Sequence, residues 1–495
     1  LLTSGSRIAL PRHRTLHATI EWSHDLLSPP ERTLFRRLAV FSGGWALEAA
    51  EEVCCGDPLA AGDTLDLLTR LVERSLVGVH EQHGHTRYRF LETVRVYALE
   101  RLLEAGELDA TRTRHRDWCL AFAERAAAGL GRRDQIEWVR RLAIEHDNMR
   151  AAIETCRADI DGATAELRLA AAMGQFWRMQ LPSEGRRRLS EALSRADARP
   201  SSARAAALVW LASIENLFGD PSTGRALAQQ SLSDARAVGD LGRAAYALRQ
   251  LAQATAESDA DARVAFLEEG LRLARAAGAD SEAAAQLAFL AASAAEDGDL
   301  DRVHALLEEG ERLARRAGDA WNGVQPLAQL GWLAVAEDRL ADAEVHFQHA
   351  LDLAEGIGYV AAAAFSLVGL GQVAVRRGDL EKARAIHCHA LLIQREAGGA
   401  YLASGLLYLA SVEEAAGHHE RAQRLVGASE AWHATRGGAE GVWLPWTHGP
   451  LRRGLVTLPP LPVDLALIKV RAEGRGMRLD EAVAWALAQD NLSTI

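Results

Sequence analysis

The sequence predicts an all-α protein, in which a small winged-helix domain is followed by a right-handed α-solenoid of repeated helix pairs. Three observations lead to this prediction. Aromatic residues make up only 6% of a chain dominated by Ala, Leu, Arg and Glu, which favours helices over strands. Between about residues 203 and 436, helical segments and glycines recur about every 40 residues. Near the N-terminus, several short helical patterns precede one pair of alternating segments around a Gly-containing turn.

Bulk properties bound the class of protein. A chain of 495 residues is too long for one core, so about two to four domains are expected. The net charge of −11 excludes a nucleic-acid footprint spread over the whole molecule. Five cysteines without a C-x-x-C pair argue against a disulfide framework and favour the cytoplasm. Residues 1–20 lack a signal-peptide core and the first methionine is Met149, so we expect the back part of a longer protein.

The N-terminal module begins with an amphipathic helix over residues 14–27. A second helix starts at Ser28, where Ser can cap, Pro occupies the first turn and Glu31 complements the dipole. Further helices are expected over residues 46–55 and 64–75. The alternating segments 76–79 and 87–90, joined by a polar turn through Gly84, predict the β-hairpin that completes a winged helix.

The repeats are marked by helices that align without a gap at residues 266–274, 306–314 and 346–354, with Leu273, Leu313 and Leu353 in register. Glycines end these helices at intervals of 39 or 40 residues, and Gly-Asp-type turns lie between them. Gly supplies the left-handed cap that ends one helix, and Asp can cap the start of the next. The glycines are Gly239, Gly278, Gly318, Gly358 and Gly398, and the turns are Gly298-Asp299, Glu337-Asp338, Gly378-Asp379 and Gly417-His418.

Small residues within the repeats predict close helix packing. Ala343, Phe347 and Ala350 have the A-x3-F-x2-A spacing of a tetratricopeptide helix, and Leu330-Gly331 and Leu370-Gly371 match the L-G of its partner helix. The segment resembles the tetratricopeptide repeat family, lengthened from about 34 to about 40 residues per unit. The resemblance implies a continuous core and a concave groove for a peptide or protein.

Specific motifs resemble a second, larger family. They include Arg14-Thr-Leu-His-Ala-Thr-Ile-Glu-Trp-Ser-His-Asp-Leu-Leu27, Gly43-Gly-Trp45 and Glu145-His-Asp-Asn-Met-Arg-Ala-Ala152, with further matches at residues 31–41, 65–76 and 88–98. These motifs are similar to those of actinobacterial signal-transduction ATPases of the STAND class, including LuxR-type and AfsR-like transcriptional regulators. The resemblance covers essentially the whole chain. It implies the order ATPase core, winged helix, tetratricopeptide sensor and, in some members, a C-terminal helix-turn-helix reached through a segment like residues 479–487.

The chain departs from that family in lacking a phosphate-binding loop, G-x4-G-K-[ST], whose Lys neutralises phosphates and whose hydroxyl holds Mg²⁺. Its two lysines, Lys382 and Lys469, stand in Leu-Glu-Lys-Ala and Leu-Ile-Lys-Val. We therefore expect no cofactor in this chain, with ATP or ADP and Mg²⁺ only on a preceding core. The expected division is a linker over residues 1–14, winged helix 15–106, helical connector 107–200, repeats 201–436 and helical cap 437–495.

Candidate metal and catalytic sites have plainer interpretations. His80, His83 and His85 surround the hairpin turn, but no Cys or acid completes a zinc spacing, although Glu81 is adjacent. His387-Cys388-His389 point to different sides of a helix, and His418-His419 lie at a turn. No G-x-S-x-G elbow occurs, and the acid pairs Glu268-Glu269 and Glu308-Glu309 recur with the repeat, as a solvated face would. We assign no metal, catalytic or cofactor-binding residue and expect a protein that is not an enzyme.

The winged helix offers two functions. Residues 64–75 could be a recognition helix that binds DNA, with Arg87 and Arg89 on the wing. DNA-binding faces are strongly basic, however, and in this helix Asp66 and Glu73 offset the charges of Arg70 and Arg74. The resemblance implies instead that the module packs on the ATPase core and holds it closed. The basic runs Arg132-Arg133 and Arg186-Arg-Arg188 are expected to be solvated.

Two apolar features of the sequence each allow two interpretations. The uncharged stretch 358–375 is poor in Leu and Ile, so a buried repeat helix is preferred to a membrane span. The C-terminal aromatics and prolines could line a ligand pocket, but are expected to cover the end of the repeats. They are Trp432, Trp443, Pro445, Trp446, Pro450 and Trp485.

These observations predict the regulatory and sensor portion of a transcriptional regulator, which binds a small molecule or protein on the repeat groove and acts through the winged helix on its own ATPase core. DNA would be contacted only indirectly, and no membrane partner is expected. The alternatives are a stand-alone protein-binding adaptor and a regulator that binds DNA with the wing itself.

Overall fold

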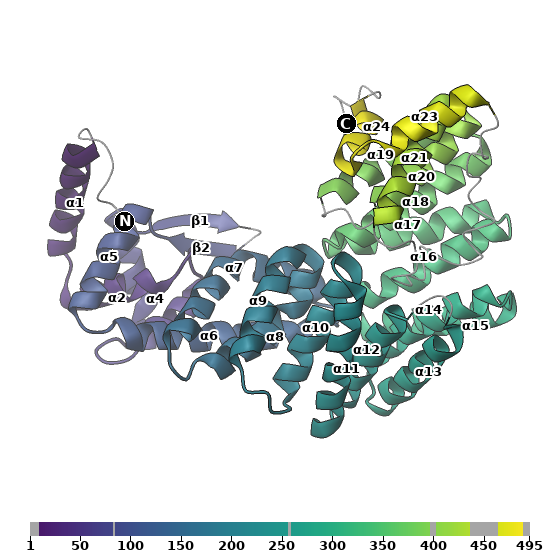
Figure 1. Cartoon of the computed structure of the whole chain (residues 1–495). Coiled ribbons are helices and arrows are strands. Elements are labelled where there is room, and N and C mark those ends of the chain that lie inside the picture. The colour runs from purple at the N-terminus through teal and green to yellow at the C-terminus, as the bar shows by residue number, and fades with distance from the viewer. Residues whose placement is uncertain (1–8, 83–84, 256–258, 397–401, 436–463, 489–495) are drawn as a thin grey trace. The chain divides into compact units, whose positions relative to one another are not determined.

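The computed structural model describes residues 9–82, 85–255, 259–396, 402–435 and 464–488. The chain divides into two compact units, one formed by Leu1–Ala126 and Arg140–Leu169 and the other by Ala127–Val139 and Ala170–Ile495. Helices dominate both, and a single two-stranded sheet is present among the described residues (Figure 1). The predicted fold class, a winged helix followed by an α-solenoid of repeats, is confirmed.

The first unit begins with the helices of the winged helix. Ser28 caps α2 in a capping box, because its backbone N–H donates to the Glu31 carboxylate at 2.6 Å. One face of each helix is buried, for example Leu34 and Phe35 of α2 and Leu68 of α4. The elements are α1 (Ala9–Asp25), α2 (Pro29–Arg37), the 3₁₀ turn η1 (Leu38–Val40), α3 (Leu47–Cys54), η2 (Ala61–Asp63) and α4 (Thr64–Glu73).

The predicted hairpin is present as β1 (Gly78–Gln82) paired antiparallel with β2 (His85–Arg89). The first strand starts two residues later than predicted. Leu76 and Val77 are not in the strand because their N–H groups donate to the Leu71 carbonyl at 3.0 and 3.3 Å and so close α4. Trp45 forms an isolated bridge to Tyr88, which ties the turn before α3 to the second strand.

Three long helices contribute residues to both units. Helix α7 is the clearest case, since its residues 135–139 belong to the second unit and residues 140–158 to the first. The helices that follow the hairpin are α5 (Glu92–Glu104), α6 (Leu108–Gly129), α7 (Gln135–Ala158), α8 (Ala163–Gln180) and α9 (Pro182–Arg195).

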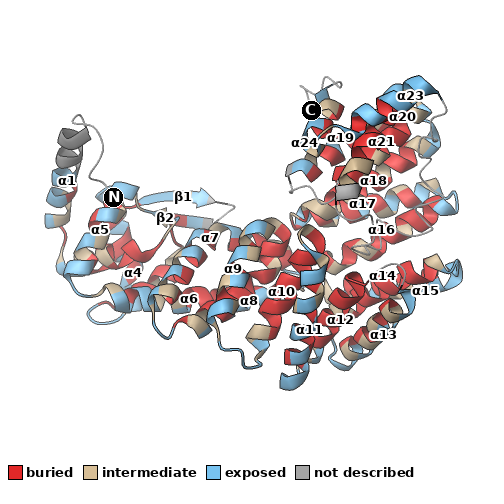
Figure 2. Ribbon diagram, viewed as in Figure 1, coloured by how far each residue is buried: buried red, intermediate tan, exposed pale blue. Residues whose placement is uncertain are grey.

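The second unit is built mainly of helix pairs in which the two members are buried differently (Figure 2). The first helix of a pair packs against neighbours on both sides, so residues 283–295 of α14 are all buried, whereas α15 buries only one stripe. The pairs are α10 (Ser202–Phe218) with α11 (Pro221–Val238), α12 (Leu241–Gln253) with α13 (Ala260–Ala276), α14 (Asp280–Glu296) with α15 (Leu300–Ala317), α16 (Ala320–Ala336) with α17 (Leu340–Gly356), α18 (Val360–Arg377) with α19 (Leu380–Glu396), and α20 (Leu402–Ala415) with α21 (His419–Thr435).

The predicted glycine caps are confirmed among the described residues, and the predicted Asp cap is present before α15 but absent before α17, whose N-cap Arg339 makes no side-chain hydrogen bond. Gly239, Gly278, Gly318 and Gly358 all have positive φ, and the side chain of Asp299 accepts from the backbone of Arg302 at the start of α15. In the turns between the helices of a pair, Asp338 stands where the neighbouring repeats have Gly298 and Gly378. Its backbone keeps the left-handed conformation, with φ of 59°. Gly398, predicted as another cap, lies outside the described residues.

The small residues of the L-G pattern receive large side chains. Phe347 packs so closely on Gly331 and Gly369 that a Cβ at either position would lie 2.8 or 2.3 Å from its ring. His387, 40 residues after Phe347, packs on Gly371 in the same way. The predicted tetratricopeptide-like contact between the helices of a pair is therefore present, and His387 takes the place of an aromatic residue.

Helix α18 is the one described helix that is long and apolar enough to cross a membrane, and 56% of that window is buried. The core helix of a soluble repeat passes the same test, and α18 lies between α17 and α19. Beyond the last pair, α23 (Leu465–Arg475) packs on α21, and α24 (Leu479–Ala488) buries Val483 against the last repeat. Trp485 packs there as a cover, whereas Trp443, Pro445, Trp446 and Pro450 lie outside the described residues.

Candidate functional site

The wing is held to α7 by a buried ion pair. Arg87 of β2 is 3% exposed, and its Nη1 donates to the carboxylate of Glu145, which is 5% exposed. Arg87 therefore cannot reach DNA, which corrects the suggestion that it belongs to a DNA-contacting wing. Arg89, two residues further on, is exposed.

Asn148 extends this contact to the turn before α3. Its Oδ1 accepts from the backbone N–H of Ser42 at 2.8 Å, and its Nδ2 donates to the Gly44 carbonyl at 2.9 Å and to Glu145 at 2.6 Å. Gly44 has φ of 99°, and a Cβ there would lie 2.6 Å from the Tyr88 carbonyl oxygen. Both the Gly43-Gly-Trp45 and Glu145–Ala152 motifs thus meet at one contact, which we call the wing clamp: Ser42, Gly44, Arg87, Glu145 and Asn148.

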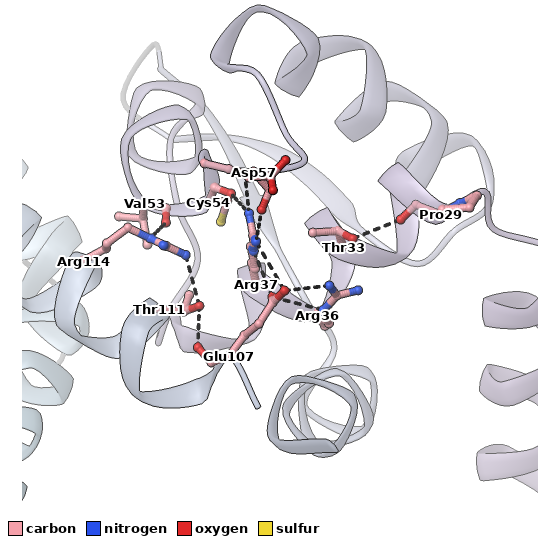
Figure 3. Close-up of polar contacts among 11 residues, drawn as sticks. Pro29, Thr33, Arg36, Arg37, Val53, Cys54, Asp57, Glu107, Thr111 and Arg114 are labelled. Carbon is pink, nitrogen blue, oxygen red and sulfur yellow. Dashed lines mark hydrogen bonds and ion pairs between the residues drawn. The ribbon is translucent and has the colours of Figure 1, made fainter. Parts of the chain in front are cut away.

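A second polar cluster holds α2 to the loop after α3 (Figure 3). Arg37 donates to the carbonyls of Cys54, Gly56 and Asp57 at 2.8 to 3.0 Å. Glu107 accepts from both Arg36 and Arg37. Burial by itself would raise the pKa of Glu107, but the hydrogen bonds from the two guanidinium groups outweigh it and lower the pKa to about 2. This cluster is structural support for the winged helix.

The exposed face of α4, the candidate recognition helix, is nearly neutral. Asp66 and Glu73 stand beside Arg70 and Arg74, and all four are exposed. Arg70 also lies 3.9 Å from Glu31. The face therefore lacks the surplus of positive charge that phosphate contacts require.

A pocket opens on the repeat unit between α8 and the first helices of successive pairs. Its cavity volume is about 50 Å³. Two arginines and no acid are among its lining residues, and the other residues are a mixture of aromatic, amide and small aliphatic side chains with the Ser213 hydroxyl. The aromatic lining residues are Tyr246, Phe289, Trp321, Tyr359 and Phe365.

The two arginines of this pocket differ in their partners. Arg249 donates from Nε and Nη2 to both oxygens of Glu282 at 2.9 Å, so its charge is compensated. Arg178 is 5% exposed, donates from Nε to the Ser213 hydroxyl at 3.2 Å and lies against the rings of Phe218, Trp321 and Tyr359. Its Nη1 is buried without a hydrogen-bond partner, and no described acid forms an ion pair with it. The pocket thus contains an uncompensated guanidinium.

One wall of this pocket is tied to the N-terminal end of α7. The Gln135 side chain is 1% exposed, accepts from the backbone N–H of Trp321 at 3.0 Å and donates to Asp319 at 3.3 Å. Asp319 caps α16 and also accepts from Ser281 and Asn322. Burial raises the pKa of Asp319. The first turn of α16, which carries Trp321, is therefore fixed by a residue of α7.

The histidines considered as metal ligands have other surroundings. His387 is buried on Gly371, stacks on Tyr408 at 5.8 Å, and burial lowers its pKa to about 3, so it is a neutral core side chain. His418 and His419 lie beside Glu413 and Glu414. His80 is half-buried, and the side chains of His83 and His85 lie outside what the structure describes. Within the described ranges, no cluster of three His, Cys, Asp or Glu that could hold a metal is found.

The acid pairs expected on a solvated face lie partly there. Glu268 and Glu308 are exposed, whereas Glu269 and Glu309 are half-buried and pair with Arg236 and Arg275 of the preceding repeat at 2.6 Å. Arg188 is 7% exposed, so the run of residues 186–188 is not wholly solvated, whereas Arg132 and Arg133 are exposed. None of the five cysteines forms a disulfide.

Sequence reasoning missed Arg178, because it lies on α8, before the repeat pairs, and matches no motif. A signal existed in the spacing of ion pairs. Arg236, Arg249 and Arg263 each pair with a Glu that follows 33 residues later, one repeat along. At that distance from Arg178 stand Leu211 and Ala212, so no acid is supplied.

Comparison with known proteins agrees with the winged helix. A family model described as a winged helix-turn-helix domain matches residues 27–103. The chain is 38% identical over 293 residues to a protein of Mycobacterium tuberculosis named as an HTH-type transcriptional regulator, an alignment that covers 56% of this chain and 32% of that protein. It is 44% identical over 117 residues to an uncharacterized protein of Mycobacterium bovis, covering 23% of this chain and 30% of the other. The chain thus spans about a third of the length of the curated relatives it matches.

Among solved structures, the chain is similar to a Signal Transduction ATPase with Numerous Domains (STAND) protein with a tetratricopeptide repeat sensor from Pyrococcus horikoshii. That similarity has a TM-score of 0.42 at 15% identity and covers 85% of this chain and 65% of the other.

Proposed function

We propose that this chain is the regulatory and sensor portion of a STAND-class transcriptional regulator. A ligand or partner protein binds at the repeat pocket, and the change is passed to the winged helix, which controls a nucleotide-binding core of the complete protein. The chain itself acts by binding, without metal, cofactor or catalysis of its own. ATP or ADP with Mg²⁺ would bind to that core, and the protein would work in the cytoplasm. Support comes from the winged helix-turn-helix match and from the relative named as a transcriptional regulator.

The observation that carries the proposal is the placement of functional contacts along α7. Gln135, in the first turn of α7, binds the backbone of Trp321 in the pocket wall. Glu145 and Asn148, further along the same helix, bind Arg87 and Gly44 of the winged helix. A ligand that shifts Trp321 would act on the same helix that holds the wing, and it would shift the population only as far as its affinity differs between the two states.

The coupling is tested in the native gene by replacing Gln135 with Ala and sequencing the cell's RNA. We expect Gln135→Ala to change the set of transcripts that a deletion of the gene changes. Gln230→Ala is the matched control, because Gln230 is an exposed residue of α11. A Gln135→Ala strain that matches the Gln230→Ala strain would refute the coupling through α7, and a deletion strain without transcriptional change would refute the regulatory role.

The ATPase part of the proposal is tested on the reading frame that precedes Leu1. We expect an in-frame G-x4-G-K-[ST] motif there, and release of bound nucleotide from the complete protein should become faster when the wing clamp is broken by Asn148→Ala. A frame without the motif would leave a nucleotide-free adaptor that binds a peptide on its repeats.

The winged helix-turn-helix match favours one other function, direct DNA binding. The nearly neutral face of α4 argues against it, and we expect no mobility shift of DNA at physiological salt. A salt-dependent shift that Arg70→Ala and Arg74→Ala weaken together would establish this second function instead.

A further inference from the structure

Two donor groups of residues in the repeat pocket have no hydrogen-bond partner. Arg178 and Gln325 both line the cavity, and Nη1 of Arg178 and Nε2 of Gln325 are buried without a partner among the described residues. A buried donor left unpaired costs about 1 to 3 kcal/mol, and a charged one more, so a site of this kind is completed by a ligand that accepts hydrogen bonds.

Nearby acids are already engaged elsewhere. Glu282 is held by both nitrogens of Arg249 and by Gln286 Nε2 at 3.0 Å. Asp319 accepts from Ser281 and Asn322 as the cap of α16. Neither carboxylate therefore neutralises Arg178, and the positive charge in the pocket is left for a ligand to neutralise.

Helix ends reinforce this charge. Trp321 and Asn322 lie in the first turn of α16, and Ala361 and Ala362 lie in the first turn of α18, and all four line the pocket. The N-terminal ends of two helices thus meet at the cavity. The Asp319 carboxylate already offsets the partial positive charge of α16, so the N-terminal end of α18, which has no side-chain cap, is the one that favours an anion.

Size and shape select the kind of anion. A cavity of about 50 Å³ holds three or four groups of the size of a water molecule, at about 15 Å³ each. The Trp321 and Tyr359 rings stack face to face, with centroids 4.3 Å apart and an angle of 12° between planes, and Arg178 lies over both. A flat anion with an apolar or aromatic attachment fits a guanidinium bordered by flat rings.

We propose that this pocket binds the carboxylate group of an aromatic acid, with Arg178 as its charged partner, Gln325 as a second donor and Trp321 and Tyr359 as the stacking wall. This inference rests on the proposed sensing function and specifies the class of effector. The carboxylate comes from a small organic acid or from the C-terminus of a peptide, and both sources share this recognition.

The test is isothermal titration calorimetry of the chain with phenylacetate and with a tripeptide that ends in phenylalanine, each compared with its neutral amide. We expect at least one acid to bind with a Kd of about 1 mM or tighter, as befits so small a ligand, and the amide to bind roughly 10- to 100-fold more weakly. Binding of phenylacetate indicates a small-molecule effector, and binding of the tripeptide alone indicates a peptide. This comparison needs no variant, so folding defects cannot obscure it.

Two variants assign the contact. Arg178→Met should weaken acid binding by roughly 10- to 100-fold and leave amide binding unchanged. Arg263→Met is the matched control, because Arg263 is a fully buried arginine of the same unit, paired with Glu296 and absent from the pocket lining. If circular dichroism shows that Arg178→Met does not fold, Gln325→Leu replaces it, and we expect this variant to lose less affinity for the acid.

Three results would overturn the inference: no binding of either acid, equal binding of acid and amide, or unchanged acid binding in folded Arg178→Met or Gln325→Leu. Equal binding of acid and amide would show that Arg178 does not select a carboxylate. The proposed regulatory function fails separately, through the transcript profile of the Gln135→Ala strain.

Discussion

Glu107 joins two arginines of α2 to the start of α6, and its replacement by Gln tests how much this cluster contributes to the first unit. The pKa of Glu107 is lowered from its ordinary value of 4.5 to about 2, and its side chain is 25% exposed, so solvent screening is moderate. Each tenfold change in proton affinity corresponds to about 1.4 kcal/mol, which gives about 3 kcal/mol of stabilisation near neutral pH.

The pH dependence has a defined sign. Because the folded state holds the carboxylate in its charged form, the contribution is fully present above pH 4.5 and is lost as the pH falls toward 2. We expect Glu107→Gln to lower the free energy of opening of α2 by about 3 kcal/mol near neutral pH, and the difference from wild type to shrink below pH 4.5.

The assay is hydrogen exchange by mass spectrometry on peptides from α2 and from the loop that Arg37 binds, over a pH series corrected for intrinsic exchange. Glu104→Gln is the control, since Glu104 is 59% exposed and pairs with Arg101 within α5, a contact worth about 0.5 kcal/mol or less. Equal effects of the two substitutions, or a Glu107→Gln effect that does not change below pH 4.5, would refute the reasoning.

Three further predictions concern backbone and buried charge. Arg87→Met should reduce the protection of the β-hairpin against hydrogen exchange by about 3 kcal/mol, and adding Glu145→Leu should recover most of it; additive losses would show that the two residues are not coupled. Gly44→Ala should lower stability in thermal denaturation by about 2 kcal/mol or more, because φ is 99° and a Cβ would meet a carbonyl oxygen, whereas Gly239→Ala, with φ of 73° and open space, should cost about 1 kcal/mol. Asp338→Gly should raise the melting temperature of the repeat unit through a gain of about 0.5 to 1 kcal/mol, and no rise would mean that Asp tolerates its φ of 59° without strain.

Local patterns determined the elements of this protein. Gly278, Gly318 and Gly358 recur every 40 residues, and each has the left-handed backbone conformation that ends a helix. Glycine adopts this conformation freely because it has no Cβ, so the ends of these helices follow from composition and spacing. The same holds for the hairpin and for Phe347, whose contact with Gly331 was visible as the L-G pattern.

Local patterns did not determine which side chains pair when they lie far apart in the sequence. Arg87 was placed on the wing correctly, but its burial against Glu145 depends on how α7 packs on the hairpin, 58 residues away in sequence. Glu145 and Asn148 stood out as part of a motif, and only the folded chain shows that they hold the Gly44 turn.

The candidate ligand site shows the difference most clearly. The sequence by itself determined that helix pairs repeat and where glycines end the repeat helices, because caps and periodicity are local properties of the chain. Whether an arginine is compensated depends on which acid lies within about 4 Å of it after folding. Only the tertiary structure decided that Glu282 belongs to Arg249 and that Arg178 is left facing a cavity, because that outcome is a matter of distance between helices rather than of position along one.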